Sequence, residues 1–189
     1  MDIVSHGLWA GVAAAAIRRK RPVTRGQVAA TVLLGVLPDI GQLIPVVVWS
    51  FTQGHPVDLV YAFITATPAN EPAISPMVQT LSHHLHCAMH SVVVLSVVSL
   101  VAWRLWPWLL VPLVGWWLHI ALDIPTHSND YYAVPFLYPL TYWGVDGISW
   151  TTPWLLAVNY VALAAAYAAF YFTRRRPPGP RPASAHPAD

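Results

Sequence analysis

Charged residues are scarce in this sequence: Lys, Arg, Asp and Glu together make up 10% of its 189 residues. Soluble domains carry about a quarter of charged residues, so the composition argues against a soluble domain and indicates a membrane protein in contact with the lipid bilayer. The formal net charge of +2 is small. Because the basic residues form short clusters and not a continuous face, we expect no nucleic-acid partner.

Cysteine is almost absent, since Cys87 is the only one. A single thiol cannot form an internal disulfide, and so few thiolates argue against an iron–sulfur cluster or a structural zinc site. A cleavable signal peptide is not expected either, because no basic cluster precedes the first apolar run. The basic cluster at 18–21 follows that run instead, which suits a first helix whose C-terminal end lies in the cytoplasm.

Apolar segments are abundant, and several are long enough to cross a bilayer. The sequence therefore predicts an all-α fold, a multi-pass membrane helical bundle of about five helices. In the second of these helices, Pro38 and Pro45 flank Asp39 and predict a break that lines a cavity. The five expected helices cover residues 5–17, 27–51, 81–105, 107–127 and 153–172.

The remaining segments are richer in polar, proline and aromatic residues. Residues 52–80 predict an extramembrane excursion with one short helix, and residues 128–152 predict an interfacial loop folded across the site on the outer side. We expect one membrane-embedded domain over residues 1–173. Residues 174–189 are rich in Pro and Ala and predict a disordered cytoplasmic tail.

Several ionisable residues lie inside the apolar segments, where they are costly and therefore indicate a functional site. His119, Asp123 and His127 are spaced four residues apart and share one face while the segment stays helical. His86 and His90 are related in the same way, whereas His83 and His84 are expected to be solvated at the start of their helix.

The candidate residues share one depth in the membrane. If the basic clusters at 18–25, 104 and 174–176 lie in the cytoplasm, each candidate can be placed by counting about 1.5 Å per residue along its helix. The distances are roughly 18 Å for His6 and His119, roughly 21 Å for Asp39 and His90, and roughly 24 Å for Asp123. This common layer predicts a joint site in the outer half of the bilayer, facing the non-cytoplasmic side.

Imidazole and carboxylate ligands together suit a divalent metal ion, most of all Zn²⁺, with Mn²⁺ or Fe²⁺ as alternatives. Such an ion with an open position activates water for hydrolysis near neutral pH. The expected metal ligands are His6, Asp39, His90, His119 and Asp123. The expected general base is Asp123, His86 or His127.

Each candidate also has a simpler interpretation when it is taken alone. His6 could be an interfacial histidine, and Asp39 could cap a helix that begins after Pro38. His90 and His119 could each bond the backbone of a neighbouring helix. Asp123 could pair with a histidine of its own helix, and His127 could lie beyond the bend at Pro125. The shared depth favours the joint site over these separate explanations.

The same residues resemble the YdjM-type family of bacterial inner-membrane-associated, metal-dependent hydrolases, in consistent order over about residues 1–145. The resemblance implies an inner-membrane protein that acts on a membrane-associated substrate. Where the family has a second Asp after the first, this chain has Gly41, and it has His84-Leu85-His86 where the family often has His-Arg. The resemblance therefore gives no support for a second metal ion, unless His86 replaces a ligand. The matching motifs are His6, Leu37-Pro38-Asp39, His90-Ser91, His119 with Asp123 and Thr126, and the loop through Pro135 and Pro139.

We therefore predict an enzyme, a membrane-bound hydrolase that cleaves a membrane-associated ester or phosphoester through a metal-activated water. One alternative is a haem protein with His90 and His119 as axial ligands, although a porphyrin needs no buried acids. Another is an ion-translocating protein with Asp39 and Asp123 as carriers, although the sequence shows no repeat symmetry.

Overall fold

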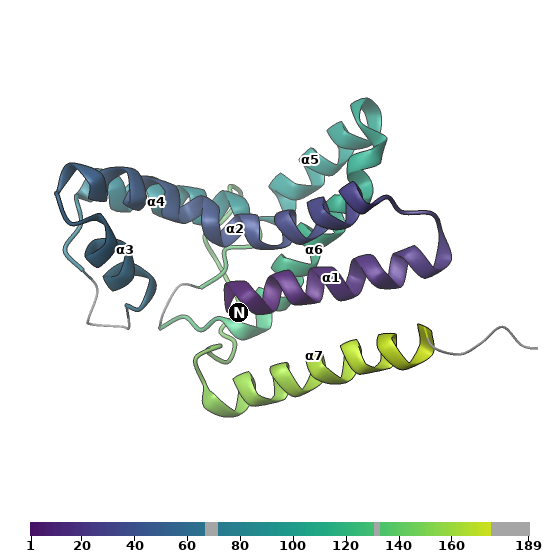
Figure 1. Cartoon of the computed structure of the whole chain (residues 1–189). Helices are drawn as coiled ribbons and strands as arrows, with labels where there is room; N and C mark the ends of the chain where they lie inside the picture. Colours follow the sequence, from purple (N-terminus) through teal and green to yellow (C-terminus); the bar gives the residue numbers. More distant parts are fainter. Residues whose placement is uncertain (67–71, 131–132, 175–189) are drawn as a thin grey trace, which may run out of the picture.

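The computed structural model describes residues 1–66, 72–130 and 133–174, and within these ranges the chain is helical, with no β-strand. This arrangement confirms the predicted all-α fold. Where about five helices were expected, the described ranges contain seven α-helices and one 3-10 helix (Figure 1). They are α1 (Ile3–Lys20), α2 (Arg25–Thr52), α3 (Pro56–Ile64), α4 (Pro76–Met89), α5 (Val92–Leu105), η1 (Pro107–Leu109), α6 (Leu110–Thr126) and α7 (Pro153–Arg174).

Three helical stretches are long and apolar enough to cross a membrane: Arg25–Thr52, Pro107–Thr126 and Pro153–Thr173. Together, α4 and α5 make a fourth candidate span, although they are bent by 61° relative to one another. The helix α1 does not meet the same criteria of length and composition, as expected from its short apolar run. The structure is thus compatible with the predicted multi-pass bundle.

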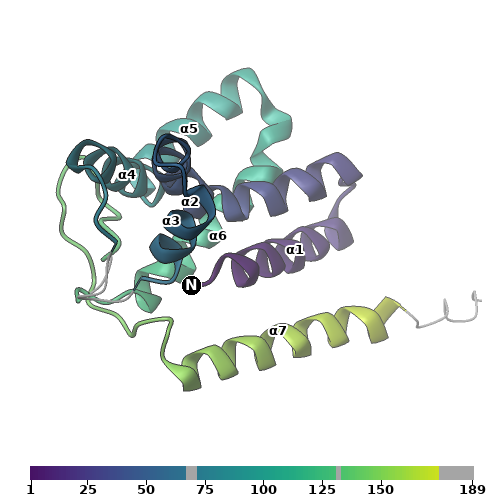
Figure 2. The ribbon, with the colours of Figure 1, turned by 60° about the vertical axis from the view of Figure 1, so that its left-hand side comes forward.

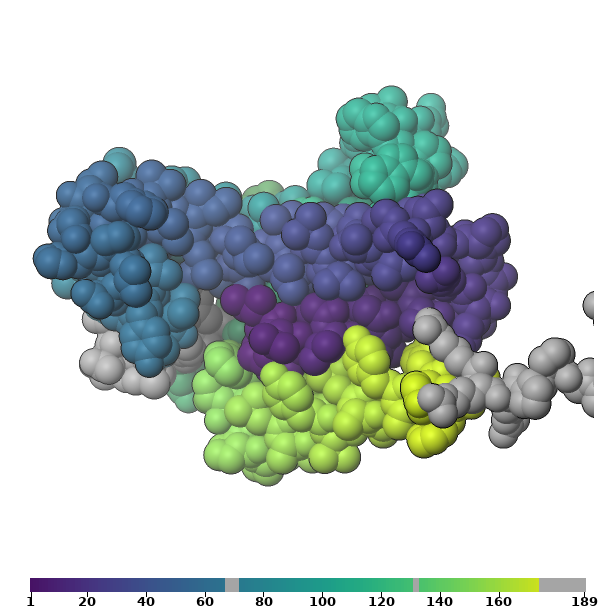
Figure 3. Space-filling view, viewed as in Figure 1, coloured from purple at the N-terminus to yellow at the C-terminus, as the bar shows by residue number. Residues whose placement is uncertain are grey.

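The helix α1 lies between α2 and α7 (Figures 1 and 2), and the space-filling view shows the three as adjacent layers (Figure 3). Asn159 of α7 links two turns of α1, because its Oδ1 accepts from Trp9 Nε1 at 2.8 Å and its Nδ2 donates to Ser5 Oγ at 2.7 Å. Near the other end, Arg19 donates to Thr173. The two helices therefore run parallel.

Close contacts between helix backbones hold α2 against α1 and α6. A Cβ atom added at Gly115 of α6 would lie 2.0 Å from the carbonyl oxygen of Thr31 in α2. A Cβ atom at Gly35 of α2 would lie 2.6 Å from the Cβ of Ala10 in α1. Small residues permit this approach in the way that is common among membrane helices, so the three helices meet closely beside the candidate site.

The predicted break in the second helix is wrong. Pro38 and Pro45 both lie inside α2, which continues from Arg25 to Thr52. A proline removes one backbone donor and does not by itself end a helix that neighbouring helices support on both sides. Asp39 consequently lies in the helix interior, which also contradicts its interpretation as an N-cap.

The single helix predicted over residues 81–105 is also wrong, because it is divided into α4 and α5 at His90 and Ser91. Ser91 caps α5, since its Oγ accepts from the backbone N–H groups of Val93 and Val94 at 3.1 Å each. The same hydroxyl donates to the carbonyl oxygen of Tyr138. Serine caps of this kind begin helices, and here the cap places His90 at the bend.

Among the described residues, the segment 53–75 contains the short helix α3, and the segment 128–152 forms an irregular loop. The loop after α6 lies against that helix end, because Gly147 N donates to His127 O at 2.8 Å and Ile148 N donates to Pro125 O at 3.0 Å. It also reaches the start of α5, where Val92 N donates to Phe136 O at 2.9 Å. The predicted disordered tail lies outside the described residues, apart from Arg174, which ends α7.

Candidate metal centre

Four helical segments bring five buried ionisable side chains together beside the contact of α1, α2 and α6. His6 comes from the first turns of α1, Asp39 from the middle of α2 and His90 from the C-cap of α4, while α6 supplies two more. The most exposed of the five, Asp39, is only 9% exposed. The five are His6, Asp39, His90, His119 and Asp123.

Four of these residues could hold a metal ion, because each offers one ligand atom and all four atoms lie within 4.8 Å of one another. The Nε2 atoms of His90 and His119 are 3.0 Å apart and lie 3.3 Å and 3.0 Å from Asp123 Oδ2. Asp39 Oδ1 is 3.8 Å from both nitrogens. Two ligands of a tetrahedral Zn²⁺ ion lie about 3.3 Å apart at metal–ligand distances of about 2.0–2.1 Å, so these separations match a metal site.

The other ring nitrogens of His90 and His119 bond to backbone. His119 Nδ1 lies 2.8 Å from the carbonyl oxygen of Gly35, and His90 Nδ1 lies 2.8 Å from that of His86. A carbonyl oxygen can only accept, so each Nδ1 donates its hydrogen and, in a neutral ring, the lone pair is on Nε2. The backbone bonds expected from the simpler interpretation therefore exist, and they aim both Nε2 atoms at the carboxylates, as partners of metal-bound histidines do.

The histidine of α1 lies next to this group. His6 Nε2 is 2.9 Å from Asp123 Oδ1, and its ring stacks on the ring of His119 with the centroids 3.7 Å apart. Among the described residues, neither nitrogen of His6 has a partner with hydrogen-bond geometry, and the same holds for Oδ2 of Asp39 and of Asp123. The amino group of Met1 also contacts Asp123 Oδ1.

These unpartnered atoms fit a bound cation. A buried polar atom without a hydrogen bond costs about 1–3 kcal/mol. A divalent ion would satisfy several such atoms at once, and nitrogen with oxygen ligands is the donor set that Zn²⁺, Mn²⁺ or Fe²⁺ accepts. The residues that are present therefore fit a metal ion.

Two further histidines border the centre. His86 is buried, and its ring centroid is 4.2 Å from that of His90. His127 follows the end of α6 in an extended conformation, beyond Pro125, with Nδ1 3.6 Å from Asp123 Oδ1 and 3.2 Å from the backbone oxygen of Asp123. Burial lowers the pKa of His127 to about 4, so its ring is neutral near neutral pH.

The sequence did not identify the groups that orient the ligands. The carbonyl oxygen of Gly35 orients His119, and that of His86 orients His90. Their only signal in the sequence is position, because Gly35 lies four residues before Asp39 and His86 four residues before His90. His83 and His84 at the outer face of α4 are exposed, as predicted. Cys87 is fully buried, with Sγ 3.5 Å from His83 Nε2.

The family model described as YdjM inner membrane protein matches residues 1–180. No curated protein and no solved structure matches the chain significantly.

Proposed function

Because the chain belongs to the YdjM inner membrane protein family, we propose that this integral inner membrane protein is a metal-dependent hydrolase of a membrane-associated ester or phosphoester. The observation that carries the proposal is the buried group of two imidazoles and two carboxylates, whose ligand atoms lie within 4.8 Å of one another. A divalent ion bound there supplies Lewis-acid activation of water and of the scissile group near neutral pH.

Zn²⁺ is the ion that the donor set favours, with Mn²⁺ and Fe²⁺ as alternatives. Asp39, His90, His119 and Asp123 would hold it, and we propose His6, whose Nε2 lies 2.9 Å from Asp123 Oδ1, as a further metal ligand of the centre. Burial within the bundle keeps bulk water away from the carboxylates, which strengthens their attraction for a cation. The bonds from Nδ1 of His90 and His119 to backbone fix the two rings before the ion binds.

A general base is needed to take a proton from water. His127 is neutral near neutral pH and lies 3.6 Å from Asp123 Oδ1, so the carboxylate would stabilise its protonated form. His86, beside His90, is the second candidate, and an oxygen of Asp123 that does not bind the ion is the third. The loop that follows α6 covers this end of the helix and limits the approach of water.

The positions of the basic residues support a site that faces the non-cytoplasmic side. Arg19 joins the C-terminal ends of α1 and α7, and Gln27 Nε2 donates to Trp108 O at 3.0 Å, so α2 begins beside the start of α6. The basic ends of α1, α5 and α7 thus lie at one end of the bundle, and basic ends favour the cytoplasm. His6 and the end of α6 lie at the other end.

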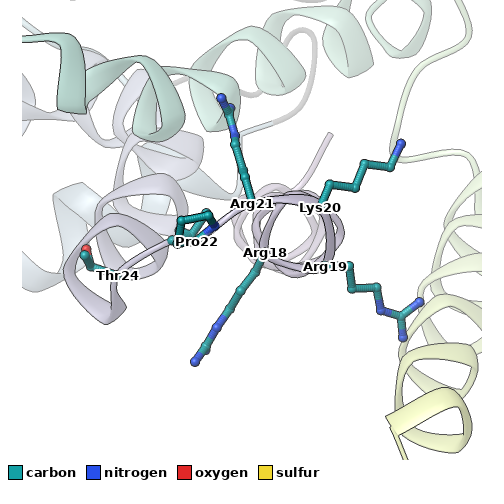
Figure 4. A pocket seen from close by; sticks show the side chains of 7 residues that line it. Arg18, Arg19, Lys20, Arg21, Pro22 and Thr24 are labelled. Carbon is teal, nitrogen blue, oxygen red and sulfur yellow. The ribbon is translucent and has the colours of Figure 1, made fainter. Parts of the chain in front are cut away.

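Figure 4 shows the basic turn between α1 and α2, where a shallow pocket is lined by residues 18–24. The side chains of Arg18, Lys20 and Arg21 point away from one another around the helix end, and that of Arg19 points toward α7 (Figure 4). They do not converge on a common ligand. Their arrangement suits contact with the headgroups of the cytoplasmic leaflet.

The haem alternative fits the geometry poorly. Axial ligands of haem iron lie on opposite faces of the porphyrin, whereas the Nε2 atoms of His90 and His119 are 3.0 Å apart with two carboxylates beside them. We expect no Soret absorption band from the purified protein. The ion-translocation alternative predicts transport into proteoliposomes that Asp123→Asn abolishes and that needs no bound metal.

Metal content and hydrolysis of the full chain in detergent test the proposal. We expect bound metal in the wild type, its loss in His119→Gln, and its retention in the control His84→Gln, which changes an exposed histidine of the same protein. Chelation should abolish hydrolysis of chromogenic ester or phosphoester substrates, and added Zn²⁺ or Mn²⁺ should restore it. Equal metal content in the wild type and His119→Gln would refute the proposed centre.

A further inference from the structure

We propose that Asp123 bridges two metal positions, with a second ion held by Asp123 Oδ1 and His6 Nε2 beside the one held by Asp39, His90, His119 and Asp123 Oδ2. This inference rests on the proposed function, because it concerns the same centre. His127 borders the second position, but its Nδ1 donates to the backbone oxygen of Asp123 at 3.2 Å, so it is a neighbour and not a ligand.

The two oxygens of Asp123 face different sets of imidazoles. Oδ2 lies 3.0 Å from His119 Nε2 and 3.3 Å from His90 Nε2. Oδ1 lies 2.9 Å from His6 Nε2 and 3.6 Å from His127 Nδ1. A carboxylate with nitrogen ligands at both oxygens is arranged as a bridge between two ions, and the ions of two-metal hydrolytic centres lie about 3.5–4 Å apart.

The ring of His6 stacks on the ring of His119 beside Asp123. Their ring centroids are 3.7 Å apart with 26° between the ring planes, and the two Nε2 atoms approach different oxygens of Asp123. Near-parallel rings that share a carboxylate in this way offer their lone pairs to neighbouring points.

His6 has no other use for its nitrogens in the structure. It is 2% exposed, and within the part of the chain that the structure describes neither Nδ1 nor Nε2 has a partner with hydrogen-bond geometry, although Nε2 lies 2.9 Å from Asp123 Oδ1. A short contact between two polar atoms without hydrogen-bond geometry is expected where both atoms bind one cation. The amino group of Met1 contacts the same Oδ1 in the structure, so an ion bound there would take the place of this positive charge.

The second metal position does not involve Gly41, which stands where the family has a second Asp. A Cβ atom at Gly41 would lie 3.5 Å from Met89 Cε, so this part of α2 faces an apolar side chain. A second ion held through Gly41 is therefore not supported, in agreement with the sequence. The ligands come instead from α1 and from the end of α6.

The test is the number of Mn²⁺ ions bound by the full chain in detergent, with electron paramagnetic resonance to detect coupling between them. We expect two ions per wild-type chain and an exchange-coupled spectrum. His6→Gln should retain one ion with the spectrum of isolated Mn²⁺, and the control His84→Gln should retain two. His127→Gln, which removes a neighbour and no ligand, should also retain two.

The outcomes separate this inference from the proposed function. A single uncoupled ion in the wild type would overturn the second position and leave the metal centre standing, whereas no bound ion would refute the centre itself. Two ions in His6→Gln would remove His6 from the site. If His6→Gln does not fold, the wild-type stoichiometry and spectrum still decide.

Discussion

Replacing Gly115 by Ala should weaken metal binding although Gly115 touches no ligand atom. The added Cβ would lie 2.0 Å from the carbonyl oxygen of Thr31, whereas carbon and oxygen atoms in contact lie about 3.3–3.6 Å apart. The helices α2 and α6 must therefore separate by about 1.4 Å at this point. Overpacking of this kind costs about 1–3 kcal/mol of stability.

The separation would act on the metal centre through His119, one turn further along α6. Its Nδ1 lies 2.8 Å from the carbonyl oxygen of Gly35 across the same helix contact, and its Nε2 lies 3.8 Å from Asp39 Oδ1. A shift of about 1.4 Å would break the first contact and lengthen the second. Loss of a bond that orients a ligand reduces metal affinity by about 10–100-fold.

Competition between the protein and a chromophoric chelator measures this affinity. We expect a decrease of about 10–100-fold for Gly115→Ala and no change for the control Gly26→Ala. A Cβ atom at Gly26, also in α2, would meet only Thr24 Oγ1, at 3.8 Å. Wild-type affinity in a folded Gly115→Ala protein would show that the helix contact does not position the ligands.

Three further predictions concern the bridge and the helix caps. Asp123→Asn should remove all bound metal in a metal analysis, because both oxygens face histidines; retention of metal would contradict the central role of this carboxylate. Ser91→Ala should lower the free energy of unfolding by about 1 kcal/mol, measured by thermal denaturation, because α5 loses the acceptor for two backbone N–H groups. Burial raises the pKa of Asp2, but hydrogen bonds from Ser5 outweigh it and leave this pKa below its usual value. The stability that Asp2 contributes is therefore complete above its unfolded-state pKa of about 3.9. It is lost as the pH falls through the lower folded-state pKa. Asp2→Asn should abolish that part of the acid dependence of stability, and an unchanged pH profile would contradict this prediction.

The histidines show how a simple interpretation and a functional one can both hold for the same residue. His90 and His119 do bond backbone carbonyl oxygens, as isolated polar residues in membrane helices do. Each uses Nδ1 for that bond, so Nε2 remains available toward the carboxylates. A histidine that uses only Nδ1 for the backbone bond can also bind a metal through Nε2. Which ring nitrogen makes the bond cannot be read from a sequence.

The sequence by itself determined the helical class and the apolar spans, and it predicted a common depth for the five central residues. These features depend on composition and on the fixed rise of a helix, about 1.5 Å per residue, so they need no knowledge of neighbouring segments. The depth estimate placed His6, Asp39 and Asp123 within one layer, and the structure has them in one cluster. Their role as metal ligands stays a prediction.

The tertiary structure alone decided where helices continue, where they bend and which atoms face each other. Proline at 38 and 45 signals a break, but packing against α1, α4 and α6 keeps α2 continuous. Serine at 91 gives a weak local signal, yet its bonds to α5 and to the loop fix the bend. The two-sided environment of Asp123 depends on the rotation of four segments about their axes, which is set by contacts between residues far apart in the chain, such as Gly115 and Thr31.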